Sequence, residues 1–372
     1  MEKDEKVYRI FVVNPGSTST KLSLFENSSC LFTTDVFHDS AVLKTFPTIN
    51  DQLDYRMEVV QKFLEDNHID LRGIDAIVGR GGGCYPIVSG IYRIDDCLIR
   101  DTREIKGGLR HASMLGVQMA DVLHRKYGGL MLMMDPPVVD ELCDLARMTG
   151  VDGIYRKAIS HAMNLKATAR KHAAAIGRKY EECNFIVCHI DGGISITAHE
   201  KGRMIDGNDA GGGEGPFTPT RMGSMAVSDV LQYFGPEKAE ELKSLCSQTG
   251  GLSSYFGTSN SDTIHRMVEE GDPKAVHVWN AMIYQIIKWI GSMSTVLRGN
   301  VDGILLTGGL LRFQDVTDRI RESCQWIAPV TVYQGESEQK TMAEGALRVL
   351  RGEEEAKQYP GRPVWDGFRD EK

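Results

Sequence analysis

The sequence predicts an α/β fold that is built twice along the chain. An apolar strand at 9–13 runs into a glycine turn and a second strand at 21–25. The same order of strand, glycine turn and strand returns at 185–198, where Gly192 aligns with Gly16. Helical patterns alternate with strands in both halves, which indicates mixed sheets flanked by helices. We therefore expect two duplicated domains with a nucleotide in the cleft between them.

The first half combines a hairpin with crossover helices. Apolar runs predict strands near 7–13, 21–25, 30–37, 75–79, 86–94 and 130–134. Helical spacing of apolar residues predicts helices near 52–66, 109–126 and 138–148. A hairpin that leads into strand and helix units predicts a mixed sheet.

The second half opens with a helix at 154–180 that is rich in alanine and basic residues. The second hairpin follows it. A further apolar run from Gly303 ends in a third glycine turn at 308–310, and a last helix is expected at 342–351.

Composition and charge limit the classes of function. The chain has 372 residues, enough for two domains, and its net charge of −8 argues against nucleic acid as a partner. Its eight cysteines form no Cys-x-x-Cys pair, and its charged N-terminus lacks a signal-peptide pattern, so we expect a cytoplasmic protein. The most apolar helical stretch predicts a core or interface helix and no membrane span, because polar side chains interrupt it at His277, Asn280, Gln285 and Lys288.

The first hairpin has the features of a phosphate-binding turn. Asn14 ends the strand, Gly16 permits close backbone approach, and Ser17–Thr20 offer hydroxyl and N–H groups to oxyanions. It is not a Walker loop, because no second glycine precedes Lys21 and residues 22–25 alternate as a strand. An ordinary turn is the alternative interpretation.

The three glycine turns resemble the phosphate 1, phosphate 2 and adenosine motifs of the superfamily of acetate and sugar kinases, heat-shock ATPases and actin. The segment 14–21 is similar to the opening of the butyrate kinases in the acetokinase family. Further matching segments lie at 135–142, 156–167, 213–221 and 343–348. The resemblance implies two ribonuclease H-like, actin-like ATPase domains, an N-terminal one at 1–150 plus about 340–372 and a C-terminal one at 151–339.

The resemblance also implies a carboxylate kinase that reversibly transfers the γ-phosphoryl group of ATP to butyrate or a related short-chain or branched acid, giving an acyl phosphate and ADP. ATP or ADP would be the co-substrate and Mg²⁺ the cofactor of a homo-oligomer. Because donor and acceptor are both anions, arginines and a divalent cation are needed, whereas an ionised carboxylate needs no general base. Acetate or propionate as acceptor stays open. More distantly, a sugar or polyol kinase with Asp135 as base stays open as well.

Four residues are candidates for catalysis. Arg80 stands between glycines after an apolar strand, and the resemblance implies that it binds the acceptor carboxylate or the transferring phosphoryl group. Arg221 follows the glycine-rich 211–215 loop and matches the second catalytic arginine. Asp135 is implied to be an active-site acid, with a helix N-cap as the alternative. His161 is implied to stabilise the phosphoryl group by a hydrogen bond, with a helix-capping or core role as the alternative.

The expected binding residues come from the three glycine turns and their neighbours. For phosphate and substrate they are Asn14, Gly16, Ser17, Thr18, Ser19, Lys21, His111, His189, Asp191, Gly192 and Gly193. For adenosine they are Gly308, Gly309 and Leu310. Alternatively, His111 starts a helix and His189 is a core histidine at the end of a strand. The family's acidic metal ligand before the last helix implies Glu336 or Glu338, with first-turn helix charge as the alternative.

Overall fold

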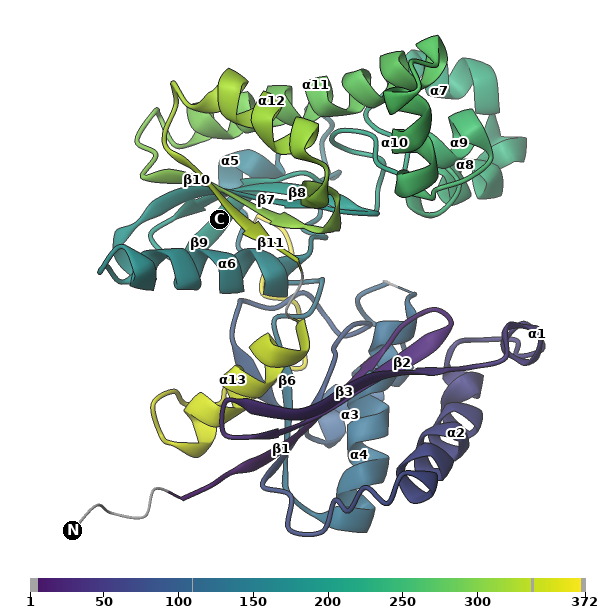
Figure 1. Cartoon of the computed structure of the whole chain (residues 1–372), viewed down its shortest axis with the longest axis vertical. Helices are drawn as coiled ribbons and strands as arrows, with labels where there is room; N and C mark the ends of the chain where they lie inside the picture. Colours follow the sequence, from purple (N-terminus) through teal and green to yellow (C-terminus); the bar gives the residue numbers. More distant parts are fainter. Residues whose placement is uncertain (1–5, 109, 336–337, 369–372) are drawn as a thin grey trace. The chain divides into compact units, whose positions relative to one another are not determined.

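The computed structural model describes residues 6–108, 110–335 and 338–368. Contacts divide the chain into two compact units, one comprising Met1–Asp140 with Ser337–Lys372 and the other Glu141–Glu336. Each unit is a β-sheet covered by helices (Figure 1). The α/β architecture predicted from the two hairpins is therefore confirmed.

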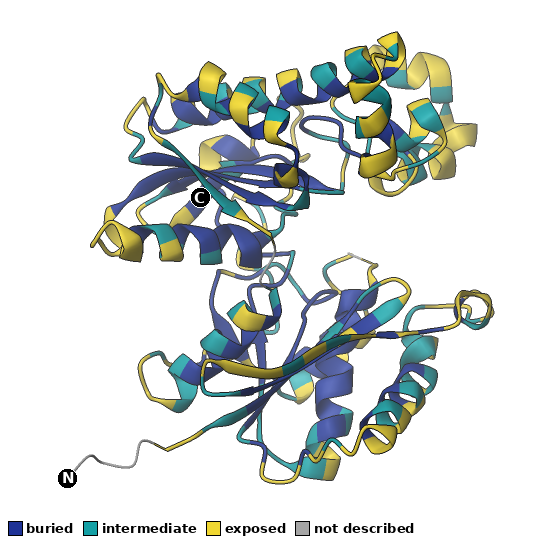
Figure 2. Ribbon diagram, in the orientation of Figure 1, coloured by how far each residue is buried: buried dark blue, intermediate teal, exposed yellow. Residues whose placement is uncertain are grey.

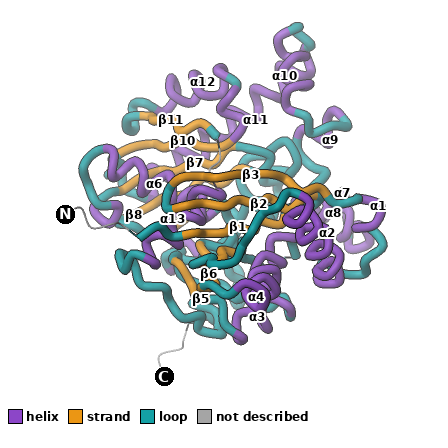
Figure 3. The backbone as a smooth tube through the Cα atoms, turned by 60° about the horizontal axis from the view of Figure 1, so that its bottom comes forward, coloured by secondary structure: helices purple, strands orange, loops and turns teal. Residues whose placement is uncertain are grey.

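The first unit contains a six-stranded sheet in the order β3-β2-β1-β4-β6-β5. Its strands are β1 (Arg9–Pro15), β2 (Ser19–Glu26), β3 (Ser29–Phe37), β4 (Ala76–Gly79), β5 (Ile91–Arg93) and β6 (Leu130–Met134). β1, β2 and β3 form an antiparallel meander, and Figure 3 shows them side by side. β4 and β6 follow β1 in parallel. The polar residues at the carboxyl ends of these three strands are therefore brought to one edge of the sheet.

Helices cover both faces of this sheet. They are α1 (Ser40–Leu43), α2 (Leu53–Asp66), α3 (Asp96–Arg103), α4 (Leu115–Tyr127) and α13 (Glu338–Leu350), with 3-10 turns η1 (Asn50–Gln52) and η2 (Ala112–Met114). α4 packs against β1, β4 and β6, whereas α13, from the end of the chain, packs against the same strands on the opposite face (Figure 1). The last helix is thus part of the unit that the first strand begins.

The second unit repeats the strand arrangement of the first. Its strands are β7 (Asn184–Ile190), β8 (Ile194–Glu200), β9 (Arg203–Gly207), β10 (Gly303–Gly308) and β11 (Val330–Gln334). Their order is β11-β10-β7-β8-β9, with an antiparallel meander from β7 to β9 and with β10 parallel to β7. β1 to β4 have the same pairing in the first unit. The two sheets therefore support the duplication that the sequence predicted.

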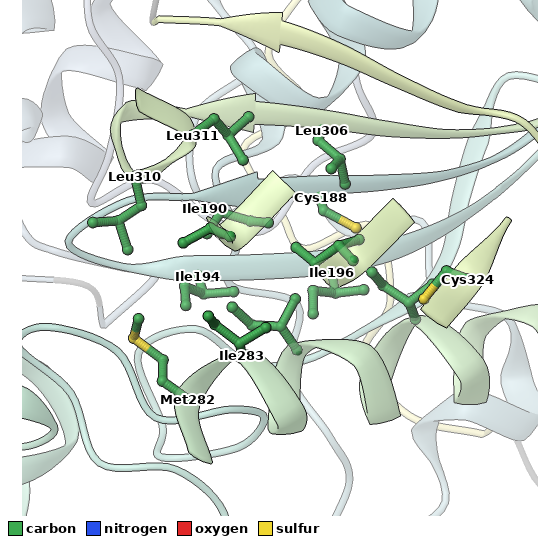
Figure 4. Close-up of a cluster of buried hydrophobic side chains, with 14 of the residues drawn as sticks. Cys188, Ile190, Ile194, Ile196, Met282, Ile283, Leu306, Leu310, Leu311 and Cys324 are labelled. Carbon is green, nitrogen blue, oxygen red and sulfur yellow. The ribbon is translucent and has the colours of Figure 1, made fainter. Parts of the chain in front are cut away.

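The second core lies between this sheet and α11. The helices of the unit are α5 (Asp144–Arg147), α6 (Ala162–Ala175), α7 (Val227–Phe234), α8 (Ala239–Ser247), α9 (Leu252–Phe256), α10 (Ser261–Glu269), α11 (Pro273–Val296) and α12 (Gln314–Cys324), with η3 (Tyr180–Glu182), η4 (Pro236–Lys238) and η5 (Gly309–Arg312). Met282 and Ile283 of α11 face Ile194 and Ile196 of β8 in Figure 4, and all four side chains are buried. The apolar stretch at 275–297 is thus a core helix. No helix in the described part of the chain is long and apolar enough to cross a membrane.

Three predicted elements are shorter than expected. The helix predicted at 138–148 is formed only as α5, because residues 138–140 pair with the backbone of Ile87. The strand predicted at 86–94 is formed only as β5, and the helix at 154–180 only as α6. For the helix predicted at 138–148, local spacing did not reveal the backbone pairing with a distant segment.

Burial follows the layers of each unit. Buried strands appear as dark blue ribbons in Figure 2, and the elements that cover them carry exposed residues on their outer sides.

The buried histidine after β3 makes the first unit sensitive to acid. His38 is 5 % exposed, and its Nε2 lies 2.7 Å from Thr20 Oγ1. Burial, with a smaller effect of the Arg56 cation, lowers the pKa of His38 from 6.5 to about 4. The unfolded chain therefore binds more protons than the folded chain between these two pH values.

We predict that the stabilisation from a neutral His38 is complete above about pH 6.5 and is lost as the pH falls toward about 4. The loss amounts to roughly 3 kcal/mol at most. Urea unfolding of the parent protein and of His38→Gln at both pH values measures it, because the variant lacks the titrating ring. The same pH dependence in both proteins would contradict the prediction.

Candidate active site

Asn14, Arg80 and Glu338 meet at one edge of the first sheet. Asn14 lies next to the last residue of β1, and its Nδ2 donates a hydrogen bond to Glu338 Oε2 at 2.7 Å. Arg80 follows β4, is 6 % exposed, and places Nη2 at 3.4 Å from Glu338 Oε1. The Glu338 carboxylate at the start of α13 therefore contacts two residues that lie at the carboxyl ends of neighbouring parallel strands.

A close backbone contact fixes the position of Arg80. Gly79 ends β4 beside Gly116 of α4, and a Cβ on Gly79 would overlap the carbonyl oxygen of Gly116. A Cβ on Gly116 would likewise overlap the backbone of Arg80. Only glycine at both positions lets the helix lie this close to the strand end. The glycine before Arg80 therefore serves packing as well as the loop.

Asp135 supports Arg80 from the end of β6. It is fully buried, and its Oδ1 accepts hydrogen bonds from Ser89 Oγ at 2.8 Å and Gly90 N at 2.7 Å. Its carbonyl oxygen accepts a hydrogen bond from Arg80 Nη1 at 3.3 Å. Its φ of 37° is rare for a residue with a side chain. The N-cap alternative does not describe this residue, because its carboxylate binds the 89–90 turn instead.

The remaining first-unit candidates lie on turns. Ser17 and Thr18 are exposed, whereas Ser19 and Lys21 lie near Asp35, with Lys21 Nζ at 3.9 Å from Asp35 Oδ2. Gly16 N donates a hydrogen bond to Ser19 O at 2.7 Å, which closes the turn. The turn thus presents its first two hydroxyl groups to solvent.

His111 is exposed and immediately precedes η2. Its Nδ1 accepts a hydrogen bond from Ser113 N at 3.1 Å, so it caps this turn. Capping is the structural role considered for this residue, and a contact with substrate stays a prediction.

Two histidines and an arginine meet in the second unit. His161 precedes α6, and its Nδ1 lies 2.8 Å from Ser195 Oγ. The centre of its ring lies 4.2 Å from the ring centre of His189, which belongs to β7 and is 1 % exposed. A Cβ on Gly193 would lie 2.5 Å from Arg221 Nη1 and 2.9 Å from His161 Cε1. Gly193 therefore leaves the space in which Arg221 and His161 approach each other.

Arg221 is held by the loops around it. Its Nη1 donates a hydrogen bond to Ala210 O at 2.6 Å, and its backbone N donates one to Thr218 Oγ1 at 3.0 Å. Burial lowers the pKa of Arg221, and the negative charge of Asp209 opposes this effect. The guanidinium forms no ion pair at salt-bridge distance with any carboxylate of the described residues. A partly buried guanidinium in this state is suited to an anionic ligand.

Asp191 connects the second and third glycine turns. Its Oδ1 accepts a hydrogen bond from Gly192 N at 2.8 Å, and its Oδ2 accepts one from Gly309 N at 3.0 Å. Gly308 precedes this contact at the end of β10. The side chain of Leu310 is 1 % exposed and belongs to the core, so it does not face solvent. These motifs are adjacent in the folded unit.

Residues outside the sequence-based prediction also shape this part of the unit. Thr218 and Thr220 donate hydroxyl hydrogen bonds to Gly192 O at 2.7 and 2.8 Å, and Ser195 contacts His161. Thr218 and Thr220 lie in the 213–221 segment, which matched the family motif. The threonines of that segment could have indicated this role in the sequence.

Of the two acidic candidates for metal binding, only Glu338 lies within the residues that the structure describes. Glu336 lies outside the described residues, and Glu338 is held by Asn14 and Arg80. The described part of the chain contains no group of three or more His, Cys, Asp or Glu side chains arranged for a metal ion. Mg²⁺ commonly keeps several waters and takes one or two protein carboxylates together with phosphate oxygens. A single carboxylate fits that mode of binding.

A family model matches part of the chain, and individual relatives match nearly all of it. Residues 149–325 match the model of the acetokinase family. Over 356 residues the chain is 43 % identical to a probable butyrate kinase of Coprothermobacter proteolyticus and 40 % identical to butyrate kinase 2 of Clostridium acetobutylicum. Each alignment covers 95 % of this chain and 99 % of the relative.

Solved structures with the same fold are more distant in sequence. An acetate kinase of Porphyromonas gingivalis superposes with a TM-score of 0.75 at 18 % identity, covering 92 % of this chain and 100 % of that one. A propionate kinase of Francisella tularensis gives 0.71 at 17 % identity, with 91 % and 98 % covered. These structures confirm the predicted actin-like ATPase fold.

We predict that Gly79→Ala destabilises the first unit by about 3 kcal/mol, at the upper end of overpacking costs, because the new methyl group meets backbone that cannot rotate away. Urea unfolding followed by circular dichroism measures the change. Gly291→Ala in α11 is the matched control, since its Cβ would meet no atom within 4 Å. Equal stability of the two variants would show that the contact is not as rigid as described.

Proposed function

The chain belongs to the acetokinase family, and from this membership we propose that it is a carboxylate kinase that reversibly transfers the γ-phosphoryl group of ATP to butyrate or a related short-chain or branched acid. The products are an acyl phosphate and ADP. The observation that carries the proposal is the 43 % and 40 % identity to two proteins named as butyrate kinases over 95 % of the chain. The geometry of each unit supports it.

Arg80 is proposed to bind the acceptor carboxylate or the transferring phosphoryl group. Two unit charges of the same sign about 4 Å apart repel by about 4 kcal/mol at an effective dielectric near 20, so an acid and ATP need a cation between them. Glu338 pairs with the Arg80 guanidinium and also accepts a hydrogen bond from Asn14. The Asp135 carbonyl oxygen accepts a hydrogen bond from Arg80 Nη1. The acceptor carboxylate is already ionised at neutral pH, so the proposed reaction requires no general base.

Arg221 and His161 are proposed to stabilise charge on the transferring phosphoryl group. His161 would act as a hydrogen-bond donor, and His189 would lie behind it. The Gly16–Lys21 turn and the segment 191–193 are proposed to bind phosphates, and the 308–310 turn adenosine. The absence of a side chain at Gly193 supports this assignment, because a Cβ there would lie 2.5 Å from Arg221 Nη1. An array of fixed donors is how enzymes stabilise such transition states.

Mg²⁺ is proposed as the cofactor, and Glu338 is the described residue that would hold it, directly or through water. When bound, the ion neutralises charge on the nucleotide phosphates. The two compact units are proposed to be the N-terminal and C-terminal domains of the family. Homo-oligomeric assembly and a cytoplasmic location stay predictions from the sequence.

We predict that a hydroxamate assay with ATP, Mg²⁺ and a panel of two- to five-carbon acids gives acyl phosphate, with butyrate or a branched acid preferred over acetate. Each buried methylene is worth about 0.8 kcal/mol, so the preference for butyrate over acetate is expected to be about tenfold. No acyl phosphate from any acid would refute the proposed function. Higher efficiency with acetate or propionate would favour those acids, and ADP formed only with a sugar would favour the sugar kinase.

We predict that Gly193→Ala lowers kcat about 100-fold while the melting temperature changes little. The new methyl group displaces the ends of two side chains, Arg221 and His161, which move at small cost in stability. Displacement by about 1 Å near reacting groups is enough for such a loss. Steady-state kinetics and thermal melts are compared with Gly291→Ala, which should match the parent in kcat and melt at the same or a slightly higher temperature, because alanine favours a helix interior over glycine. Normal turnover of Gly193→Ala would remove the assigned roles of Arg221 and His161.

A further inference from the structure

The Gly16–Thr20 turn is held from inside the first unit by Arg56. Arg56 lies in α2 and is 0 % exposed. Its Nη1 donates hydrogen bonds to Gly16 O at 2.9 Å and Ser19 O at 3.4 Å, and its Nη2 donates one to Ser17 O at 2.9 Å. One guanidinium thus binds three carbonyl groups of a single turn.

Neighbouring residues complete this arrangement. Arg56 Nε donates to Gln52 Oε1 at 3.0 Å, which fixes the plane of the guanidinium. His38 N donates to Thr18 O at 2.9 Å. The carbonyl groups of residues 16–19 are therefore all bound by donors of the protein. Four consecutive carbonyls satisfied in this way leave the turn with one defined conformation.

The inward carbonyls determine the direction of the N–H groups. In a trans peptide the C=O and N–H bonds point in opposite directions. Because Arg56 binds the carbonyls of Gly16 and Ser17, the N–H groups of Ser17 and Thr18 point away from Arg56. Both residues are exposed, so these N–H groups and the two hydroxyl groups share the outer side of the turn. Successive N–H groups in a turn form a concave site for an anion.

The positive charge of Arg56 also favours an anion at this turn. All its hydrogen bonds go to neutral oxygens, and within the described residues it has no ion pair with a carboxylate. Burial lowers the pKa of Arg56 from 12.5 to about 10, so the side chain keeps its proton at neutral pH. A full positive charge therefore lies behind the turn, where little solvent screens it.

We propose that Arg56 is the positioning residue of this turn: its buried guanidinium aims the N–H groups of Ser17 and Thr18, and directs its own charge, at a phosphoryl oxygen of the nucleotide. The inference rests on the proposed function, which makes the turn a phosphate site. Arg56 does not touch the ligand in this arrangement. It acts through the backbone that it holds.

A purely structural role is the competing explanation, and the chain offers a matched control for it. Arg9, at the other end of β1, also donates to two backbone carbonyls, Arg72 O at 2.7 Å and Asp70 O at 2.8 Å. That contact is remote in sequence from the phosphate turn. An arginine that only joins segments should behave like Arg9.

The test compares Arg56→Met and Arg56→Lys with Arg9→Met and Arg9→Lys in the full chain. Melting temperature, ATP binding by calorimetry without acid, and kcat/KM for ATP are measured well below the melting transition. Arg56→Met should lose about 100- to 1,000-fold in kcat/KM, as enzymes do when a charge-stabilising donor is misplaced. Arg56→Lys, which keeps the charge without the planar fork, should lose about tenfold. Both should bind ATP more weakly, and the Arg9 variants should stay within about twofold of the parent.

Parent-like kcat/KM and ATP affinity in folded Arg56→Met would overturn the proposal, and so would equal losses in the Arg9 variants. If Arg56→Met does not fold, Arg56→Lys decides: a loss at unchanged melting temperature supports the proposal, and parent values overturn it. A parent protein that binds ATP but phosphorylates no acid would refute the carboxylate kinase alone. The ATP-binding comparison would then still test Arg56.

Discussion

The contact of Glu338 with Asn14 and Arg80 is the interaction on which the first unit's candidate site depends. Asn14 lies near the end of β1, Arg80 follows β4, and Glu338 begins α13, so the carboxylate connects three distant parts of the sequence. The partly buried amide of Asn14 gains a hydrogen-bonding partner and the buried guanidinium of Arg80 gains an ionic one, which lowers the cost of burying them. The arrangement requires both the parallel strands and the return of α13.

The sequence predicted the parts of the fold that local patterns encode. Both hairpins, the strands that follow them and α11 were expected, because apolar periodicity and glycine turns specify them within short windows. The shortening of the helix predicted at 138–148 was not expected. It occurs because residues 138–140 pair with the backbone of Ile87. Spacing within one segment carries no information about such a partner, so tertiary pairing decided the outcome.

The candidate site divides in the same way. Arg80, Asp135, His161 and Arg221 were found from motifs, and the structure gives each of them polar partners close to other candidates. Arg56 was not found, because an arginine within a predicted amphipathic helix resembles a solvent-facing residue. Its role depends on which way α2 faces, and only the packed sheet determines that direction. Residues that act by holding backbone leave a weaker pattern than residues in glycine-rich motifs.

The position of α13 also sets an order of events during synthesis. The ribosome releases β1, β4 and Arg80 early, but the helix that packs against these strands comes from the end of the chain. The second unit, at 141–336, can complete its sheet and core while the first unit still lacks α13. The part of the first unit that is made first is therefore completed only after the second unit, and its apolar sheet face stays uncovered by its own helix until residues 338–350 have been made.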